Sequence, residues 1–324
     1  MKTFLKLIAL ALIIALGVVF FYVPHYFLTD VSVELSEESD GSITVMSTNV
    51  RFYNPLDFLK QSWFYRASLI VDDINSVKPD IIGFQEATFI HYDYLKKAMP
   101  DYSSEMAYRD DFILSEGCPV FYRTDKFELV DSEFGTYPEF IEGYEGSFND
   151  VRSKSWNLGV FRIKENGEIF VFATTHLWWK QSPSDGLFSQ GSSVQAYSDE
   201  AREYQLELLT QKVDHYRKKY NCPAIVVGDM NTHYNSKAIQ TAFANGFRHA
   251  HDIATDFSEQ SVGYHNCFPW GYENKYFDTP FESAIDHILV IGEKEGAVKR
   301  FERYSPDYYF PISDHSAAYI DIEL

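Results

Sequence analysis

The sequence has few cysteines and lacks the short motifs of several large enzyme classes. Cys118, Cys222 and Cys267 are its only cysteines, and no CxxC pair occurs. Such a set is neither a zinc knuckle nor a disulfide framework, although it leaves one disulfide open. The chain also lacks HExxH, the serine motif GxSxG and the phosphate loops GxxxxGK[ST] and GxGxxG. These absences argue against zinc peptidase, serine hydrolase and nucleotide-binding chemistry.

Basic residues are scarce as well. The chain has 28 Lys and Arg against 47 Asp and Glu, so its formal net charge is −19, and it contains no Lys/Arg-rich run. Such a surface repels a polyanion unless a basic groove or divalent cations offset the charge locally. High-affinity binding of duplex nucleic acid is therefore disfavoured, although it is not excluded. The 45% hydrophobic and 23% charged composition is that of a folded globular protein.

The N-terminus holds a long apolar run. Lys2 and Lys6 precede residues 7–23, which carry no charge, and about 20 apolar residues suffice to cross a bilayer. No small-x-small cleavage site follows, and the aromatic residues that do follow suit a membrane–water interface. We predict that residues 1–28 are an uncleaved signal-anchor, a single-pass membrane segment. Because the positive flank stays inside, the rest of the chain would be extracytoplasmic; a secreted protein released by signal cleavage is the alternative.

The remainder of the chain is predicted to form one domain, residues 42–324, after an acidic juxtamembrane linker at residues 29–41. Apolar patterning predicts many short strands and a few helices. The expected strands are residues 42–50, 80–88, 119–123, 126–129, 159–163, 168–175, 224–227, 284–290 and 316–323, and the expected helices are residues 56–77 and 199–220. Two strand pairs are expected to be hairpins: 119–123 with 126–129, and 159–163 with 168–175 around Asn166-Gly167.

Polar, chemically capable side chains stand at the ends of several predicted strands. They are Asn49, Glu86, His176, Asp229 with Asn231, Asp286, and Asp314 with His315. One such strand end is an ordinary turn, but the repetition suggests that the ends converge on a common site. The set is rich in oxygen ligands and has no thiolate, which favours Mg²⁺, with Mn²⁺ or Ca²⁺ as alternatives, over structural zinc. A divalent cation, an activated water and hydrogen-bond donors are what phosphoester hydrolysis requires.

The same residues carry a family resemblance. In chain order they lie in TNV at 48–50, GFQEA at 83–87, TTHL at 174–177, GDMN at 228–231, IDHI at 285–288 and SDH at 313–315. Six motifs in this order resemble the endonuclease/exonuclease/phosphatase superfamily, over nearly all of residues 42–324. The resemblance implies an α+β fold, a four-layered α/β/β/α sandwich of two packed mixed sheets. It also implies a divalent-metal-dependent phosphoester hydrolase.

The resemblance further implies roles in holding the metal. Glu86 would be the principal metal ligand, and Asn49 would lie beside the metal and orient it or its water. Asp314 would lie near the metal.

The catalytic roles that the resemblance implies fall on five residues. Asp229 would activate the attacking water, and Asn231 would hold the phosphate oxygens. His176 would contact the phosphate or help the leaving group. His315 would act on the scissile phosphate, with Asp286 orienting its ring.

Other residues are weaker candidates for substrate contact. Arg152 is one, because the guanidinium fork matches phosphate geometry. Trp178 and Trp179 either cover the substrate or pack the loop that contains them. The long stretch at residues 177–199 and the aromatic-rich stretch at residues 264–281 could wall the rim of the site and set substrate choice.

These observations favour a phosphodiesterase acting on a lipid-like or small soluble phosphoester. A secreted or membrane-tethered nuclease is the alternative within the same chemistry. A non-catalytic binding protein that kept the fold is a further alternative, disfavoured because Glu86, Asp229 and His315 are all present. The calcineurin-like phosphoesterases also use a Gly-Asp strand end, but this chain lacks their GNH motif. The membrane is the expected partner of the N-terminal helix, and no obligate protein partner is indicated.

Overall fold

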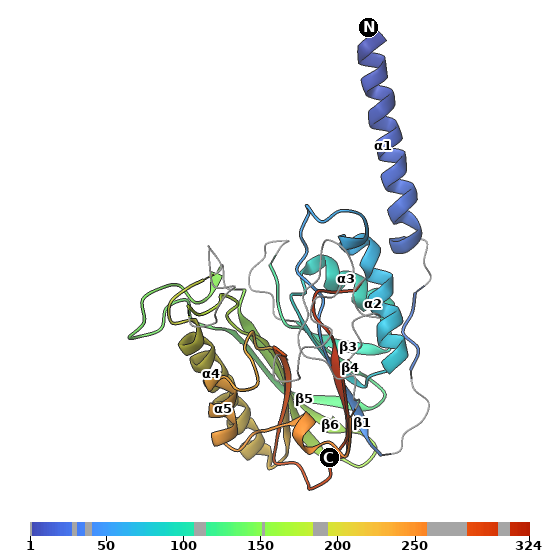
Figure 1. The fold of residues 1–324 in the computed structure, drawn as a ribbon. Helices are drawn as coiled ribbons and strands as arrows, with labels where there is room; N and C mark the ends of the chain where they lie inside the picture. The colour runs from blue at the N-terminus through green and yellow to red at the C-terminus, as the bar shows by residue number, and fades with distance from the viewer. Residues whose placement is uncertain are drawn as a thin grey trace.

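Two β-sheets pack face to face, and helices cover the outer face of each sheet (Figure 1). The computed structural model describes residues 2–27, 31–35, 41–106, 115–150, 153–183, 194–257, 284–303 and 312–324. Helix α1 projects from this body, and α2 and α3 lie on the opposite side of the sheets from α4 and α5 (Figure 1). The expected α+β fold of two packed mixed sheets is confirmed.

Of the strands that the structure describes, the first four along the chain belong to one sheet, the next five to the other, and of the last four only β11 (Asp286–Ile291) belongs to the second sheet. The helices are α1 (Lys2–Tyr26), the short 3₁₀ turn η1 (Leu59–Gln61), α2 (Trp63–Val77), α3 (Phe89–Ala98), α4 (Ser198–Tyr220), α5 (Lys237–Ala244) and α6 (Ala250–Ile253). The first sheet has the order β10 (Asp256–Phe257), β12 (Val298–Arg303), β13 (Ala318–Ile322), β1 (Ile43–Asn49), β2 (Ile81–Gln85), β4 (Val120–Arg123), β3 (Tyr102–Glu105). The second has the order β5 (Phe127–Thr136), β6 (Ser155–Ile163), β7 (Ile169–His176), β8 (Ala224–Asp229), β11 (Asp286–Ile291), β9 (Arg248–His249).

The buried apolar residues separate into layers. One cluster, with Trp63 and Ile82, joins α2 and α3 to the first sheet. A second lies between the two sheets and includes Ile225 and Val227 of β8, whereas Val226 belongs to a third cluster beneath α4 and α5. Successive side chains of a strand point to opposite faces, so β8 is apolar throughout because both of its faces are covered.

The two sheets approach each other closely near one end. Strands β1 and β2 run parallel, as do β7 and β8, so each pair ends at the same edge of its sheet. A Cβ atom on Gly83 would lie 2.6 Å from Val227 Cγ2 and 2.7 Å from Thr174 Cβ, so only glycine allows this approach. Just beyond it, Gln85 Nε2 donates a hydrogen bond to Thr174 Oγ1 at 2.9 Å and ties the sheets together. The strand ends of both sheets are thereby held at one rim.

One of the two predicted hairpins is wrong. Strands β4 and β5 follow each other in the chain, but β4 pairs in the first sheet and β5 in the second. Arg123 fixes the connection between them. Its guanidinium binds Asp125, which follows β4, and it lies 3.2 Å from Asp80, which immediately precedes β2. The other hairpin, β6 with β7 around Asn166-Gly167, is confirmed.

Helix α2 begins later than the sequence pattern predicts. The expected start was residue 56, whereas α2 begins at Trp63 after an extended Ser62. The residues before it form a loop and the η1 turn, and Leu59 has a positive φ of 55°. The apolar side chains at helical spacing in residues 56–59 face solvent and do not contribute to the core.

Helix α1 contains one candidate membrane span. Residues Thr3–Pro24 are long and apolar enough to cross a bilayer, and none of this stretch is buried in the body. Part of the predicted linker packs against the body instead of extending freely: Val33 is buried, and its backbone N–H donates to Ala98 O at 2.8 Å. Cys118 and Cys222 are buried free thiols, and Cys267 lies outside the described residues.

Candidate active site at the rim of the two sheets

The predicted site residues of the second sheet meet through strand pairing. Asp229 ends β8, and it stands opposite His176 of the parallel neighbour β7. On its other side it stands opposite Asp286, the first residue of the antiparallel neighbour β11. The first sheet brings Asn49, at the end of β1, against this row. Its Nδ2 donates to Asp229 Oδ2 at 3.0 Å.

The Asp229 carboxylate both forms a turn and faces the site. Its Oδ1 accepts a hydrogen bond from the backbone N–H of Asn231 at 2.9 Å, the contact expected of an Asx turn. Its Oδ2 lies 3.3 Å from His176 Nε2 and 3.7 Å from His315 Nε2. One oxygen therefore fixes the carboxylate and leaves the other directed at the cluster. The Asn231 side chain lies beside it, with Nδ2 donating to Leu177 O at 3.1 Å.

The backbone around the site is strained. Glu86, Asn231 and Arg51 have positive φ angles of 59°, 49° and 60°, which side-chain-bearing residues rarely adopt. A Cβ atom on Gly228 would lie 2.1 Å from Thr175 O, so only glycine fits before Asp229. These conformations turn the side chains at the strand ends toward one another.

Glu86 follows β2 and is anchored by two donors. Asn49 Nδ2 donates to its Oε1 at 3.1 Å, and the backbone N–H of Phe52 donates to Oε2. Asn49 therefore bridges Glu86 and Asp229, which come from different sheets. The Glu86 side chain is only partly buried, so it lies at the mouth of the cluster.

His315 and Asp286 form a close pair. His315 Nδ1 lies 2.9 Å from Asp286 Oδ2, and Arg303 Nη2 donates to the Asp286 backbone carbonyl at 2.8 Å. Burial by itself lowers the pKa of His315, but the carboxylates of Asp286 and Asp229 outweigh it and raise that pKa well above its ordinary value. The two carboxylates therefore favour the imidazolium form of His315, in which both ring nitrogens donate hydrogen bonds.

The pKa values of Asp229 and His176, the other acid and the other imidazole of the cluster, shift in opposite directions. Burial raises the pKa of the Asp229 carboxyl, the nearby carboxylates of Asp286 and Glu86 raise it further, and His315 counteracts them. Burial lowers the pKa of His176 well below its ordinary value, and the charges of Lys154 and His315 lower it further. The cluster thus combines a carboxyl with a raised pKa, an imidazole with a lowered pKa and an imidazole with a raised pKa.

Asp314 lies at the edge of the cluster in an ion pair. Its Oδ2 accepts a hydrogen bond from Arg51 Nη1 at 3.0 Å. Burial raises the pKa of Asp314, but the charges of His315, Arg51 and Arg66 outweigh it, so the pKa is lowered. The loop is fixed to β1 because Ser313 Oγ donates to the Asn49 backbone carbonyl at 2.6 Å.

The donor set fits a divalent cation. Two groups of side chains, Glu86 with His176 and Asp229, and Asp229 with Asp286 and His315, each bring ligand atoms within 4.8 Å of one another. Such closely spaced carboxylates repel one another, and a bound cation offsets this repulsion. Glu86 is the carboxylate at the mouth, and Asn49 lies directly beside it. Of the three residues predicted to hold the metal, Glu86 belongs to one of these groups, Asn49 lies beside it, and Asp314 belongs to neither group.

A family comparison agrees with this geometry. The model of the endonuclease/exonuclease/phosphatase family matches residues 46–315, which include every motif named above. The chain belongs to this family. Its membership confirms the resemblance on which the predicted roles depend, and it confirms the assignment to metal-dependent phosphoester hydrolases.

Curated relatives and solved structures of this family differ in how much they share with the chain. The exoribonuclease subunit Ccr4 of the CCR4-Not complex of Phaeosphaeria nodorum is 20% identical over 88% of this chain, and the match spans 60% of Ccr4. A Bacteroides vulgatus endonuclease/exonuclease/phosphatase has 25% identity and a TM-score of 0.67, with 87% of this chain and 99% of that chain covered. A mannosyl-6-phosphatase of Bacteroides thetaiotaomicron has 24% identity and a TM-score of 0.67, covering 86% and 98%. At 24% identity, the similarity to the mannosyl-6-phosphatase shows a shared fold and not a shared substrate.

The sequence analysis missed one residue that the fold of this chain brings into the cluster. Lys154 is almost completely buried, and its Nζ lies 2.9 Å from His176 Nε2. Its backbone is held by Asn149, whose Oδ1 accepts from Lys154 N at 2.8 Å. The signal that could have found it is the Asn166-Gly167 turn, because the register of this hairpin pairs Ser155 with His176 and so brings the preceding lysine beside the histidine.

The three weaker candidates for substrate contact do not share one position. Trp178 is completely buried and packs against Phe148, so its ring packs the loop, the alternative that the sequence left open. Trp179 is 40% exposed and its Nε1 donates to Asp150 Oδ2 at 3.2 Å. Arg152 and residues 264–281 lie outside the described residues.

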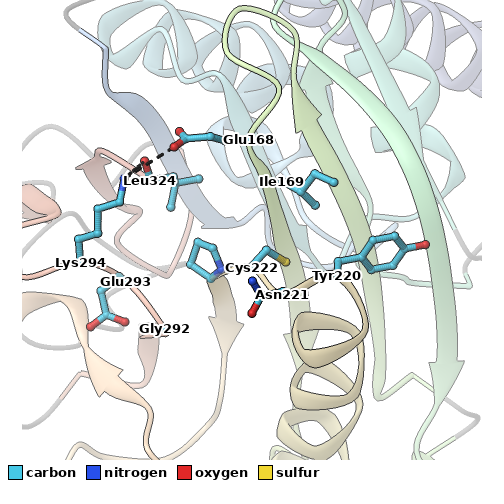
Figure 2. A pocket seen from close by; sticks show the side chains of 10 residues that line it. Glu168, Ile169, Tyr220, Asn221, Cys222, Gly292, Glu293, Lys294 and Leu324 are labelled. Atoms are coloured by element: carbon cyan, nitrogen blue, oxygen red, sulfur yellow. Dashed lines mark hydrogen bonds and ion pairs between the residues drawn. The ribbon is translucent and has the colours of Figure 1, made fainter.

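A surface pocket lies at the other end of the second sheet (Figure 2). It is lined by residues at the starts of β7 and β8, including Ile169 and Cys222, and by Lys294, which hydrogen-bonds the backbone oxygen of Leu324 at 3.0 Å. Asp229 and His176 end these same strands, so the pocket is separated from the carboxylate cluster by their full length. It is not part of the candidate site.

Proposed function

We propose that this protein is a magnesium-dependent phosphodiesterase that activates water for in-line attack on phosphorus. The observation that carries the proposal is the position of Asp229 Oδ2, which lies 3.3 Å from His176 Nε2 and 3.7 Å from His315 Nε2. A carboxyl with a raised pKa is thus placed between two imidazoles whose pKa values shift in opposite directions, and it is the residue common to both groups of possible metal ligands.

The chain's own residues divide the chemistry among them. When bound at Glu86 and Asn49, the cation would offset negative charge on the phosphoryl oxygens. Asp229 orients the attacking water and accepts its proton as the new bond to phosphorus forms, while the ester P–O bond on the opposite side breaks and the leaving alkoxide takes up a proton from solvent. His315, kept charged by Asp286, donates a hydrogen bond to a phosphoryl oxygen.

Neutral donors and a further charge complete the site. The amide of Asn231 lies beside Asp229, and by the resemblance it would contact a phosphate oxygen. His176 stands next to Lys154, whose ammonium group adds a positive charge to a site that otherwise gathers carboxylates. Donors aimed at developing negative charge stabilise the transition state.

The proposed substrate class rests on the net charge of the chain and on the N-terminal helix. The chain carries a net charge of −19, and such a surface disfavours a long polyanion. We therefore favour a lipid-like or small phosphodiester. The similarity to Ccr4 keeps a nuclease as the second candidate. We further propose that Thr3–Pro24 anchors the protein in the membrane, with the catalytic domain outside the cytoplasm.

Removal of divalent cations is expected to abolish hydrolysis of a generic phosphodiester such as bis-p-nitrophenyl phosphate, and Mg²⁺ or Mn²⁺ should restore it. Glu86→Gln should raise the metal concentration needed for half-maximal activity, because the proposed ligand loses its charge. Glu168→Gln, in the pocket at the other end of the sheet, is the matched control and should leave that concentration unchanged. Full activity in a chelated, metal-free preparation would refute the mechanism.

Lys154→Met is expected to lower kcat by roughly 10²-fold, comparable to the loss of one donor to a transition-state oxygen. The physical reason is that a fixed positive charge beside His176 is removed while the length of the side chain is kept. Lys154→Arg should recover part of the activity. The matched control is Lys126→Met, which removes a lysine that binds Asp80 far from the cluster. If kcat of Lys154→Met equals that of the control, Lys154 serves only in packing.

A further inference from the structure

Large apolar side chains stand exposed in the loop between β1 and α2. Leu56 is 86% exposed, Phe58 60% and Leu59 49%. No other large apolar side chain in the described part of the chain is as exposed as Leu56. Clustered apolar side chains of this kind mark an interaction site. We refer to residues 56–60 as the interface loop.

The interface loop touches the end of the candidate membrane span. The backbone N–H of Leu59 donates a hydrogen bond to Tyr22 Oη at 2.8 Å, and Phe21 stacks on Tyr65 with ring centroids 5.4 Å apart. Tyr22 lies two residues before Pro24, where the apolar span ends. At 1.5 Å of rise per residue this is about 3 Å along the helix axis. The loop therefore lies at the depth at which α1 leaves the apolar layer.

The charge of this region also differs from that of the whole chain. Residues 51–66 contain three basic residues and one acidic residue, whereas the chain carries −19, but Arg66 is completely buried and Arg51 is also paired with Asp314. The acidic residue, Asp57, is nearly buried and paired with Arg51 at 3.2 Å. Lys60 is the basic residue within the loop itself. An anionic bilayer surface repels acidic regions of a protein and attracts basic ones. The face that carries Lys60 is therefore compatible with such a surface.

We propose that the interface loop inserts into the headgroup region of the bilayer that holds α1, and that it thereby holds the mouth of the active site against the membrane surface. This inference rests on the proposed membrane anchor and phosphoesterase function. In Figure 1 the loop before α2 rises on the side of the body from which α1 projects. Apolar and aromatic side chains with a flanking lysine suit this layer.

The loop is joined directly to the site. Arg51 binds Asp57 of the loop and also Asp314, at 3.0 Å, and the next residue, Phe52, donates its backbone N–H to Glu86. Docking of the loop would therefore bring the carboxylate at the mouth close to the headgroup layer. The substrate class that fits this position is a phosphoester carried by an amphiphile, with its phosphate at headgroup depth.

Insertion is tested by fluorescence quenching on the full-length protein in phosphatidylcholine–phosphatidylglycerol vesicles. A fluorophore is attached at Leu56→Cys in a Cys267→Ser background, and the lipids carry nitroxide quenchers at shallow depth. The matched control is Phe257→Cys, an exposed position on β10 at the far end of the first sheet. Strong quenching at position 56 and none at position 257 is expected. Equal quenching at both positions would overturn the inference.

A second measurement separates docking from catalysis. Replacing Leu56 and Phe58 together with Asp should lower turnover of a phospholipid phosphodiester in the vesicle by about tenfold or more, since two apolar anchors are lost. Hydrolysis of soluble bis-p-nitrophenyl phosphate should be unchanged. An equal loss on both substrates would show that the loop supports the fold of the site instead. If the wild type hydrolyses neither substrate, the proposed function fails, and the quenching still decides whether the loop inserts.

Discussion

Replacing Asp229 with asparagine is expected to lower kcat about 10²–10⁴-fold, the usual effect of removing a general base. The substitution keeps the shape of the side chain, and the amide oxygen can still accept the hydrogen bond from Asn231 N. Burial and nearby carboxylates raise the pKa of Asp229, so its charged form is disfavoured in the folded protein. The variant should therefore fold and melt at the same temperature or higher, while turnover is lost. Turnover on a phosphodiester and melting temperature are measured side by side.

Asp80→Asn is the matched control for this variant. Asp80 is also a buried carboxylate next to a strand, but it lies at the opposite end of β2 and binds Arg123 and Lys126 at 3.2 and 2.8 Å. Its substitution should lower the melting temperature and leave kcat intact. If Asp229→Asn behaves like this control, the end of β8 is an Asx turn without a catalytic role.

Removal of the His315 side chain is expected to cost about 10²–10⁴-fold in kcat as well. His315→Ala removes the charged donor, whereas Asp286→Asn keeps the imidazole but withdraws the carboxylate that holds its proton and orients its ring. The Asp286 variant should therefore lose less activity. Because the two residues act through one imidazole, the double variant should be no slower than His315→Ala alone.

The neighbouring His287 supplies the control for the pair. Its Nε2 donates to Thr232 O at 2.8 Å and its Nδ1 lies 3.1 Å from His249 Nε2, so it points away from the cluster. His287→Gln should lower the melting temperature and leave kcat unchanged. If the losses from His315→Ala and Asp286→Asn multiply in the double variant, Asp286 contributes to catalysis independently of His315.

The sequence by itself determined which residue types stand at the strand ends. Apolar runs that end in Glu86, His176 or Asp229 are local signals, and their order along the chain was enough to indicate the family that the comparison then confirmed. The β6–β7 hairpin was also predictable, because the Asn166-Gly167 turn is a local preference of the backbone.

Sheet membership and surface exposure were not determined locally. The stretches at residues 119–123 and 126–129 have the pattern of a hairpin, yet they belong to different sheets, because the partners that cover them come from distant parts of the chain. Residues 56–59 continue the helical spacing of α2, but they remain outside it, and the apolar side chains of Leu56, Phe58 and Leu59 are exposed to solvent. Periodicity records which side chains are apolar, not whether another element covers them.

The charge of the site was likewise decided by the tertiary structure. Lys154 has no motif around it, and only the β6–β7 register brings its ammonium within 2.9 Å of His176. The opposite pKa shifts of His176 and His315 also arise from the tertiary structure: burial and the charge of Lys154 lower the pKa of His176, whereas the carboxylates of Asp286 and Asp229 outweigh burial at His315 and raise its pKa. Electrostatic effects depend on distance and burial, and residues far apart in the sequence acquire both only when the two sheets close on each other at Gly83.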